Sequence, residues 1–421
     1  MRFEFNKERL EKIITFLACG VFLLSSVTSF NQIFMVLMFA LLLTYWAFAH
    51  QMGSIPKQIK FIIYAFFAFF LTTIPNMLLN DSLSYGLKIF NQPLGYVLAA
   101  IVLLLMVGLR VHLNQKMIFY AIGVACFVDG VIAIYQGIVL GMDRVDGFIG
   151  ISEFGNVGAV LALCAFAYFC ISLSWKEKIF FAVATIFACF VMIFSGTRGV
   201  MIGFGAGFAL IVGLFVYFEK QRRMRVLRHS MYFLLALCIT IMSIPQAKDS
   251  IVNRFKFAIT DINQYEKKDY NAIEDLSLGQ RFEMWKEAIV IIKLSPIIGL
   301  SPKSICDRKY EINALAKSLR NPDELNCYGR YHSEILNTLA RKGFLGLLAL
   351  LAVWASLASF FWRGILQCGV VSLSMLGILL YYIVGGATGE PMSAFSEGNY
   401  FLMVVIIFAS LVFSKKETSG V

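Results

Sequence analysis

The chain has 421 residues, of which 59% are hydrophobic and 15% charged, and its formal net charge is +11. Soluble domains average about 45–50% apolar and about 25% charged residues, so this composition excludes an ordinary soluble domain and indicates a polytopic membrane protein. A basic balance can indicate nucleic-acid binding, but Lys and Arg also mark the cytoplasmic loops of membrane proteins. We therefore predict membrane lipids, and no nucleic acid, as partners.

Apolar runs long enough to cross a bilayer recur along the chain without the alternation of β-strands. Because a backbone in lipid must satisfy its own hydrogen bonds, we expect these runs to be helices. The predicted spans are 13–30, 32–49, 61–79, 95–110, 117–140, 156–173, 178–195, 199–218, 231–245, 344–361, 367–386 and 399–414. The sequence thus predicts an all-α polytopic membrane protein with about twelve transmembrane helices, each boundary good to about 2–4 residues.

Basic residues gather in alternate loops and predict the orientation of these spans. The short loops that would face outward hold only Lys88, Arg144 and Arg198, whereas EKQRRMRVLRH (219–229) is one of several basic segments in the other set. Basic loops stay in the cytoplasm, so we place both termini there. The predicted parts are 1–245 with nine spans, an external loop subdomain at 246–343, and 344–421 with three spans and a cytoplasmic tail.

The loop subdomain is expected to contain helices of its own. Segment 281–294 repeats apolar residues at helical spacing, which predicts an amphipathic helix on the outer membrane surface, with Trp285 at headgroup level and Arg281 in the first turn. Further helices are expected from Asp307 to about Arg320 and from His332 to Lys342.

Two of the nine cysteines, Cys306 and Cys327, lie in this loop. Disulfides form and persist outside the cytoplasm, so we predict that these two pair; the alternative is two free thiols. The cysteines form no CxxC motif, and the sequence contains no DxD motif for a metal-bound diphosphate. We expect no metal and no cofactor.

Several arginines are expected on the outer side. Arg198, in the minimal turn SGTRG, is flanked by glycines that allow close backbone approach, and guanidinium groups suit phosphate oxygens through paired hydrogen bonds. Arg281 at a helix start would add free backbone N–H groups to its charge. Arg144 and Arg254 are further candidates for binding an anionic substrate. Ordinary surface positions, snorkelling or loop salt bridges are the alternatives for these arginines.

His332 is the one histidine of four that the prediction places outside. It is a candidate general base, although it could also bind phosphate as a cation or be structural, and the neighbouring Glu334 is a candidate for substrate binding. Carboxylates inside or close to membrane spans are often functional, which draws attention to Asp129 and Glu390 without assigning either a role.

Three motifs together resemble the bacterial O-antigen ligase family. They are SGTRG at a span boundary, LGQRFEMWKEAI before a proline, and YHSEILNTLARKGFLG leading into a span. That family shares a superfamily with O-antigen polymerases and O-oligosaccharyltransferases, and its arrangement is similar: twelve spans with a large periplasmic loop between the ninth and tenth. The region 306–327 departs from the family pattern in its cysteines and polar residues.

The resemblance implies a location in the bacterial inner membrane and an active site on the periplasmic side. It implies a metal-independent inverting transfer of a glycan from undecaprenyl diphosphate to a sugar hydroxyl of the lipid A-core, within lipopolysaccharide biosynthesis. Arg198, Arg281 and His332 match the family's catalytic positions, Arg254 matches a loop arginine, and Arg144 matches more loosely. A polymerase, a protein O-oligosaccharyltransferase and a transporter of lipid-linked sugars are the alternative functions.

Overall fold

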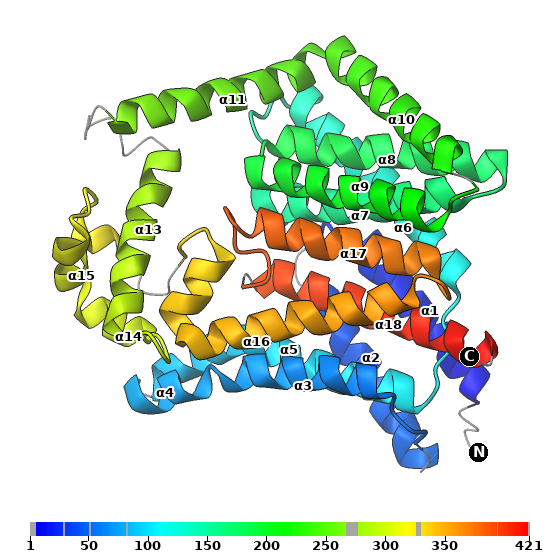
Figure 1. The fold of residues 1–421 in the computed structure, drawn as a ribbon, viewed down its shortest axis with the longest axis horizontal. Coiled ribbons are helices and arrows are strands. Elements are labelled where there is room, and N and C mark those ends of the chain that lie inside the picture. The colour runs from blue at the N-terminus through cyan, green and yellow to red at the C-terminus, as the bar shows by residue number, and fades with distance from the viewer. Residues whose placement is uncertain are drawn as a thin grey trace.

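The computed structural model of the protein describes residues 6–27, 30–49, 52–80, 83–221, 223–266, 277–325, 330–393 and 395–419. Within these ranges the chain is all-α, as predicted, and the only extended pairing is an isolated parallel bridge between Val27 and Phe148. The two termini lie at one end of the bundle of long helices, and the short helices α13, α14 and α15 lie at the other end (Figure 1).

The described helices follow one another along the chain. They are α1 (Lys7–Leu23), α2 (Phe30–Ala49), α3 (Lys57–Leu71), α4 (Ile74–Asn80), α5 (Leu83–Gly108), α6 (Gln115–Ile134), the π-helix η1 (Tyr135–Val139), α7 (Ile151–Ile171), α8 (Trp175–Ser195), α9 (Arg198–Phe218), α10 (Arg223–Ser243), α11 (Pro245–Glu266), α13 (Ser277–Leu294), α14 (Pro302–Asp307), α15 (Lys309–Ala316), the 3-10 helix η2 (Pro322–Glu324), α16 (Glu334–Gly364), α17 (Gly369–Gly385) and α18 (Phe395–Ser419).

Helices occupy all the predicted spans, although some limits differ. In the described part of the chain, nine helices are long and apolar enough to cross a membrane, and Pro93–Gly108 and Gly369–Gly385 are shorter apolar helices. The predicted span 61–79 is divided into two helices, since α3 ends at Leu71 and α4 begins at Ile74. Pro75 has no backbone N–H and therefore cannot donate the hydrogen bond that would continue α3. The count of twelve crossings stays a prediction.

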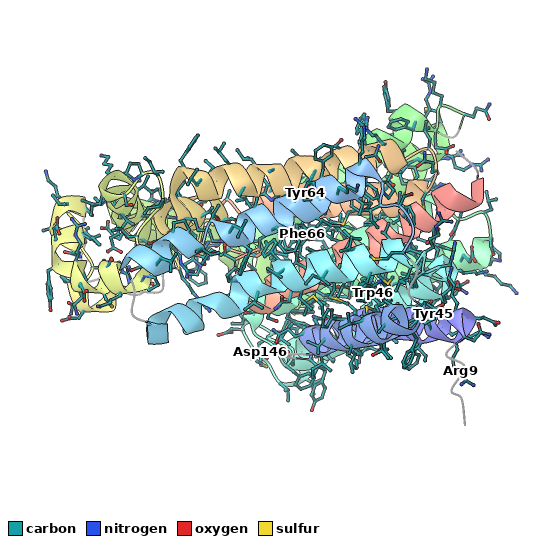
Figure 2. The ribbon with its side chains drawn as sticks, turned by 90° about the horizontal axis from the view of Figure 1, so that it is seen from below. Arg9, Tyr45, Trp46, Tyr64, Phe66 and Asp146 are labelled. Atoms are coloured by element: carbon teal, nitrogen blue, oxygen red, sulfur yellow. The ribbon has the colours of Figure 1, made fainter. Side chains whose placement is uncertain are left out.

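Burial separates central helices from peripheral ones. Within the most apolar window of α18, 94% of residues are buried, and 83% in α7, whereas α2 and α10 have only 17%. Figure 2 shows α2, which carries Tyr45 and Trp46, on the outside of the bundle. Apolar surface that is mostly exposed within the protein fits contact with lipid, so we expect α2 and the apolar part of α10 to face lipid.

Close packing of α9 on α17 fixes the position of the SGTRG turn. A Cβ at Gly203 would come within 2.8 Å of the Tyr381 carbonyl oxygen, and one at Gly207 within 2.5 Å of the Gly377 carbonyl oxygen. Small residues at this spacing let two membrane helices approach backbone to backbone. As a result, the start of α9 lies directly beside the end of α17.

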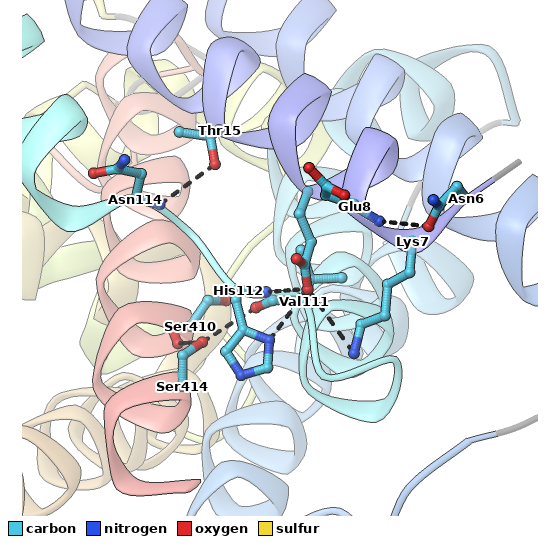
Figure 3. A network of polar contacts seen from close by, with 10 residues as sticks. Asn6, Lys7, Glu8, Thr15, Val111, His112, Asn114, Ser410 and Ser414 are labelled. Atoms are coloured by element: carbon cyan, nitrogen blue, oxygen red, sulfur yellow. Dashed lines mark hydrogen bonds and ion pairs between the residues drawn. The ribbon is translucent and has the colours of Figure 1, made fainter. Parts of the chain in front are cut away.

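At the end of the bundle that holds the termini, a polar network joins three segments (Figure 3). Glu11 of α1 accepts hydrogen bonds from the backbone N–H of His112, at 3.0 Å, and pairs with the ring Nδ1 of His112 at 3.1 Å. Ser414 of α18 donates to the carbonyl oxygen of Val111 at 3.1 Å. The turn between α5 and α6 is therefore held from both sides.

The loop subdomain begins with α11, which directly follows α10 at Pro245. Helix α13 runs across the ends of the long helices (Figure 1). The predicted helix from Asp307 to Arg320 was wrong in its limits, because α14 ends at Asp307 and α15 ends at Ala316, where Lys317 adopts a left-handed backbone with φ +49°. Cys306 is disulfide-bonded. Its predicted partner Cys327 lies outside the described residues, so this pairing stays a prediction.

The two carboxylates of α13, Glu283 and Glu287, are buried instead of solvated. Glu283 accepts a hydrogen bond from Tyr265 at 2.6 Å, and Glu287 pairs with Arg320 at 3.0 Å. The indole N–H of Trp285, predicted at the headgroups, donates to the carbonyl oxygen of Tyr331 at 2.8 Å. These contacts make α13 the centre of the loop subdomain and tie it to the segment that precedes α16.

The helix predicted to end at Lys342 does stop there, because a break at Gly343 separates it from the apolar helix that completes α16. Gly343 has a non-helical backbone with φ +62° and ψ −161°. Its Cβ position would lie 2.2 Å from the backbone of Ile297, so only glycine fits where segment 296–300 crosses. The crossing is fixed by a hydrogen bond from the Phe344 N–H to the Pro296 carbonyl oxygen at 2.8 Å.

Candidate functional site

A pocket of about 170 Å³ lies at the end of the bundle that carries α13. It is enclosed by the start of α7 and of α9, by α13, by the segment before α16, and by the link between α17 and α18. Six ionisable side chains line it: Arg281, Arg330, His332, Glu153, Glu390 and Glu397. The pocket thus joins segments that are far apart in the sequence.

Arg281 is the cation that α13 contributes. Its Nη1 donates to the carbonyl oxygen of Thr388, just beyond α17, at 3.0 Å. Burial lowers the pKa of Arg281, and the nearby positive charge of Arg198 lowers it further. The prediction that Arg281 begins its helix was wrong, because α13 starts at Ser277 and already includes the residues before Arg281.

Arg198 is the residue at a helix start, because it is the first residue of α9. Its neighbours Thr197, Gly199 and Val200 line the pocket. The Nη1 of Arg198 is buried and has no hydrogen-bond partner among the described residues, and the carboxylate of Asp261 on α11 lies 4.0 Å away. A buried guanidinium nitrogen without a hydrogen bond beside a helix N-terminus is favourably placed to bind an anion.

His332 lies between the loop subdomain and α16 in a left-handed backbone conformation, with φ +48°. Such a conformation is uncommon outside glycine and is held here by a hydrogen bond from the His332 N–H to the carboxylate of Glu390. Burial, with the charges of Arg281 and Arg330, lowers the pKa of the imidazole to about 4. The ring is therefore neutral at neutral pH and has a nitrogen lone pair that can accept a proton.

The pocket also holds carboxylates, which the sequence did not reveal as a group. It contains Glu153 at the start of α7, Glu397 at the start of α18, and Glu390. Burial raises the pKa of Glu390 to about 8, and the charge of Glu334 contributes to the increase. The sequence did contain one indication of these residues, because carboxylates next to membrane spans are unusual unless they face a polar cavity.

Arg198 itself does not line the pocket, and neither do two other predicted site residues, which hold the pocket walls. Arg144 donates from Nε to the Ser195 carbonyl oxygen at 3.0 Å and from Nη2 to the Thr197 hydroxyl at 3.3 Å. Glu334 is fully buried and accepts hydrogen bonds from the backbone N–H groups of Met392 and Ser393, each at 3.0 Å.

Arg254 is the remaining candidate, and Asp129 is the intramembrane carboxylate that drew attention. Arg254 belongs to α11, but its side chain lies outside the described residues. Asp129 of α6 is buried away from the pocket and accepts a hydrogen bond from Ser25 beside α1 at 3.3 Å. It therefore takes part in packing α6 against the first helix.

The fold and the pocket together define a class of protein. A bundle of apolar helices with a pocket of ionisable side chains at one end, walled partly by a helical loop subdomain, fits a membrane protein with a ligand site at that end. Residues 182–351 match the model of a family described as O-Antigen ligase. Over this stretch, which is less than half of the chain, the protein is similar to the O-antigen ligase family, and the match supports a ligase-type glycosyltransferase.

The matched stretch contains Arg198, Arg254, Arg281, His332 and Glu334, and it ends before Glu390. A protein of Haemophilus influenzae (strain KW20 / Rd) described as uncharacterized is 25% identical over 362 residues, which cover 83% of this chain and 85% of that protein.

Proposed function

We propose that the protein transfers O-antigen or a similar glycan from undecaprenyl diphosphate to a sugar hydroxyl of the lipid A-core, without metal, at the periplasmic face of the inner membrane. The observation that carries this proposal is the pocket in which Arg281 and His332 meet, next to Arg198. It supplies the two groups that the reaction needs, a holder for the diphosphate charge and a proton acceptor.

The diphosphate would lie against the arginines. Arg198 offers a buried Nη1 that has no hydrogen-bond partner in the described part of the chain, and Arg281 and Arg330 add positive charge from other segments. The mutual proximity of Arg198 and Arg281 is unfavourable without an anion, as the lowered pKa of Arg281 reflects. Binding a diphosphate relieves this repulsion, so the site favours a substrate with several negative charges.

In the reaction, the acceptor oxygen forms a bond to the anomeric carbon of the donor, and the bond from that carbon to the phosphate oxygen breaks. The electron pair leaves with undecaprenyl diphosphate, whose charge the arginines stabilise. The hydroxyl proton passes to a ring nitrogen of His332, which is neutral beforehand. Attack from the face opposite the leaving group gives inversion at that carbon.

The low pKa of His332 is compatible with a role as base because the substrate changes its surroundings. In the empty pocket the imidazole is disfavoured as a cation by burial and by Arg281 and Arg330. A bound diphosphate neutralises these arginines and adds negative charge, which raises the pKa of the ring. The base therefore becomes effective when the donor is in place.

The carboxylates of the pocket suit sugar hydroxyls. Carboxylates accept hydrogen bonds from hydroxyl groups, and Glu153 and Glu397 line the pocket together with Asn156. Arg281 on α13 would attract the diphosphate of the donor, and Glu153 on α7 and Glu397 on α18 would bind its sugar, so the donor would lie in one orientation. The acceptor hydroxyl then enters beside His332.

The test is a reconstituted reaction with purified protein, undecaprenyl diphosphate-linked glycan and lipid A-core in the presence of a chelator. We expect glycan-capped lipid A-core from the wild type and from Lys293→Ala, which removes an exposed cation of α13 away from the pocket. Arg198→Ala, Arg281→Ala and His332→Asn should each abolish the product at unchanged protein abundance.

The products also separate the related activities. Longer lipid-linked glycan without capped lipid A-core would identify a polymerase, and glycosylated protein would identify a protein O-oligosaccharyltransferase. Full activity of all three pocket variants would overturn the assignment of the site.

A further inference from the structure

Two further cavities lie at the end of the bundle that holds the termini, away from the proposed active site. The larger cavity, of about 710 Å³, lies between α3 and α16. Figure 2 shows these two helices side by side, with Tyr64 and Phe66 labelled on α3. Apolar and small side chains dominate its walls, among them Phe61, Tyr64 and Ala355. Its size is within the range of about 300–1,000 Å³ that is typical of ligand pockets.

The smaller cavity, of about 250 Å³, continues from the larger one, because Gln58, Phe360 and Arg363 line both. It is the more polar of the two and contains the guanidinium groups of Arg110 and Arg363. Lys57, at the start of α3, lines the same end of the apolar cavity. Three cations thus gather where a long apolar groove ends.

The backbone around Arg110 is fixed in an uncommon shape. Arg110 has φ +52°, a left-handed conformation that is costly for a residue with a side chain. The adjoining turn is held by the network of Glu11, His112 and Ser414 (Figure 3). The N–H of Gly53 donates to the Gly108 carbonyl oxygen at 2.7 Å and brings a second segment against the turn. The backbone at Arg110 is therefore fixed by the fold at the mouth of the smaller cavity.

An apolar groove on a membrane protein that ends in a cluster of cations matches a lipid with a negatively charged headgroup. Basic pockets between transmembrane helices bind anionic headgroups, and α3 and α16 border such a pocket. A zwitterionic lipid fits less well, because its own cationic group would face the same three cations. Arg110, Arg363 and Lys57 are exposed, but cations that only reach for the membrane surface would not be expected to line connected cavities, as these three do.

We propose that the paired cavities bind one anionic phospholipid. Its phosphodiester lies among Arg110, Arg363 and Lys57, and an acyl chain fills the groove between α3 and α16. The lipid would fasten α3 to α16, the helix whose beginning follows His332, and would be a structural ligand distinct from either substrate of the proposed reaction.

The binding test uses purified full-length protein in neutral detergent, titrated with phosphatidylglycerol, cardiolipin or phosphatidylethanolamine and followed by native mass spectrometry. We expect retention of phosphatidylglycerol, cardiolipin or both, and weak retention of phosphatidylethanolamine. Comparison of the two anionic lipids identifies whether one or two phosphates are preferred. Equal retention of all three lipids would overturn the proposal.

Variants locate the site. Arg110→Gln and Arg363→Gln should each weaken anionic-lipid binding about fivefold. The matched control is Lys60→Gln, which removes an exposed charge from α3 that lines neither cavity. Ala355→Phe fills the apolar groove without changing the charge and should also reduce binding. If the double arginine variant binds as the wild type does, the proposal fails. Donor binding at the other end of the bundle is measured in every variant, including Lys60→Gln. Unchanged donor binding shows that a variant is folded.

Discussion

The backbone N–H of His332 donates to the carboxylate of Glu390, and this contact joins the start of α16 to the link between α17 and α18. The two residues are 58 positions apart in the sequence. Glu334, two residues after His332, binds the same link through Met392 and Ser393. The imidazole is therefore placed by the folded ends of three helices and not by the loop subdomain alone.

If His332 is the base, His332→Asn should lower the turnover number by about 10²–10⁴-fold. Asparagine tolerates the left-handed backbone at this position better than alanine, so the fold should be preserved. Because the pKa of the free imidazole is lowered to about 4, kcat/KM should stay flat from pH 7 down to about 5 and fall below that. A kcat/KM that instead rises on acidification from pH 7 to 5 would indicate a phosphate-binding cation.

Arg281 tests the geometry of the proposed diphosphate site. One guanidinium nitrogen donates to the Thr388 carbonyl, which leaves the rest of the fork for phosphate oxygens. The single ammonium group of lysine cannot contact the Thr388 carbonyl and the phosphate oxygens together. Arg281→Lys should therefore be impaired nearly as strongly as Arg281→Ala, by about 10²–10³-fold in turnover. Full activity of the lysine variant, measured beside Lys293→Ala, would mean that charge alone is sufficient.

Arg144 should act as a positioning residue. Its two hydrogen bonds to Ser195 and Thr197 hold the turn from which Arg198 begins α9. Arg144→Ala should reduce kcat/KM by about tenfold, the effect of losing a hydrogen bond to a charged group. Asp143→Ala, which changes an exposed neighbour, is the control. A loss as complete as that of Arg198→Ala would place Arg144 in direct contact with substrate.

Glu390 should make stability depend on pH. The pKa of Glu390 in the folded protein is about 8, above the ordinary value of 4.5. Its contribution to the free energy of unfolding is therefore most favourable below pH 4.5, where the carboxyl is protonated in both the folded and the unfolded state. As pH rises towards 8, the unfolded chain ionises first and stability is lost. Glu390→Gln should therefore melt at a higher temperature than the wild type at pH 7.5 and at a similar temperature at pH 4.5.

The control for that experiment is Glu219→Gln, which removes an exposed carboxylate far from the pocket along the chain. The melting temperatures are measured in detergent at each pH. If the difference in melting temperature between Glu390→Gln and the wild type does not grow with pH, the shifted pKa is contradicted.

Glu334 should matter for folding more than for chemistry. Truncation to alanine leaves the buried N–H groups of Met392 and Ser393 without an acceptor, at a cost of about 1–3 kcal/mol for each donor. Glu334→Ala should therefore lower the melting temperature and the amount of folded protein. Glu311→Ala, which breaks an exposed pair with Arg308, should change stability by less than about 0.5 kcal/mol. Normal stability of Glu334→Ala would refute this role.

The sequence predicted the membrane helices well because lipid imposes a simple requirement on them. Long apolar runs must satisfy their backbone internally, so their positions can be read from composition alone. Limits inside the loop subdomain were less predictable. The charges of Glu283 and Glu287 indicated a solvated face of α13, but both carboxylates are buried against partners that are distant in sequence.

The sequence by itself determined the all-α membrane class and singled out Arg198, Arg281 and His332 as candidates, because hydrophobic runs and isolated charges between them are local features. Only the tertiary structure decided that Arg281 and His332 share a pocket, that Arg144 and Glu334 hold its walls, and that Glu153 and Glu397 also line it. These relationships depend on how closely helices such as α9 and α17 pack, and that packing is set by side chains from distant parts of the chain.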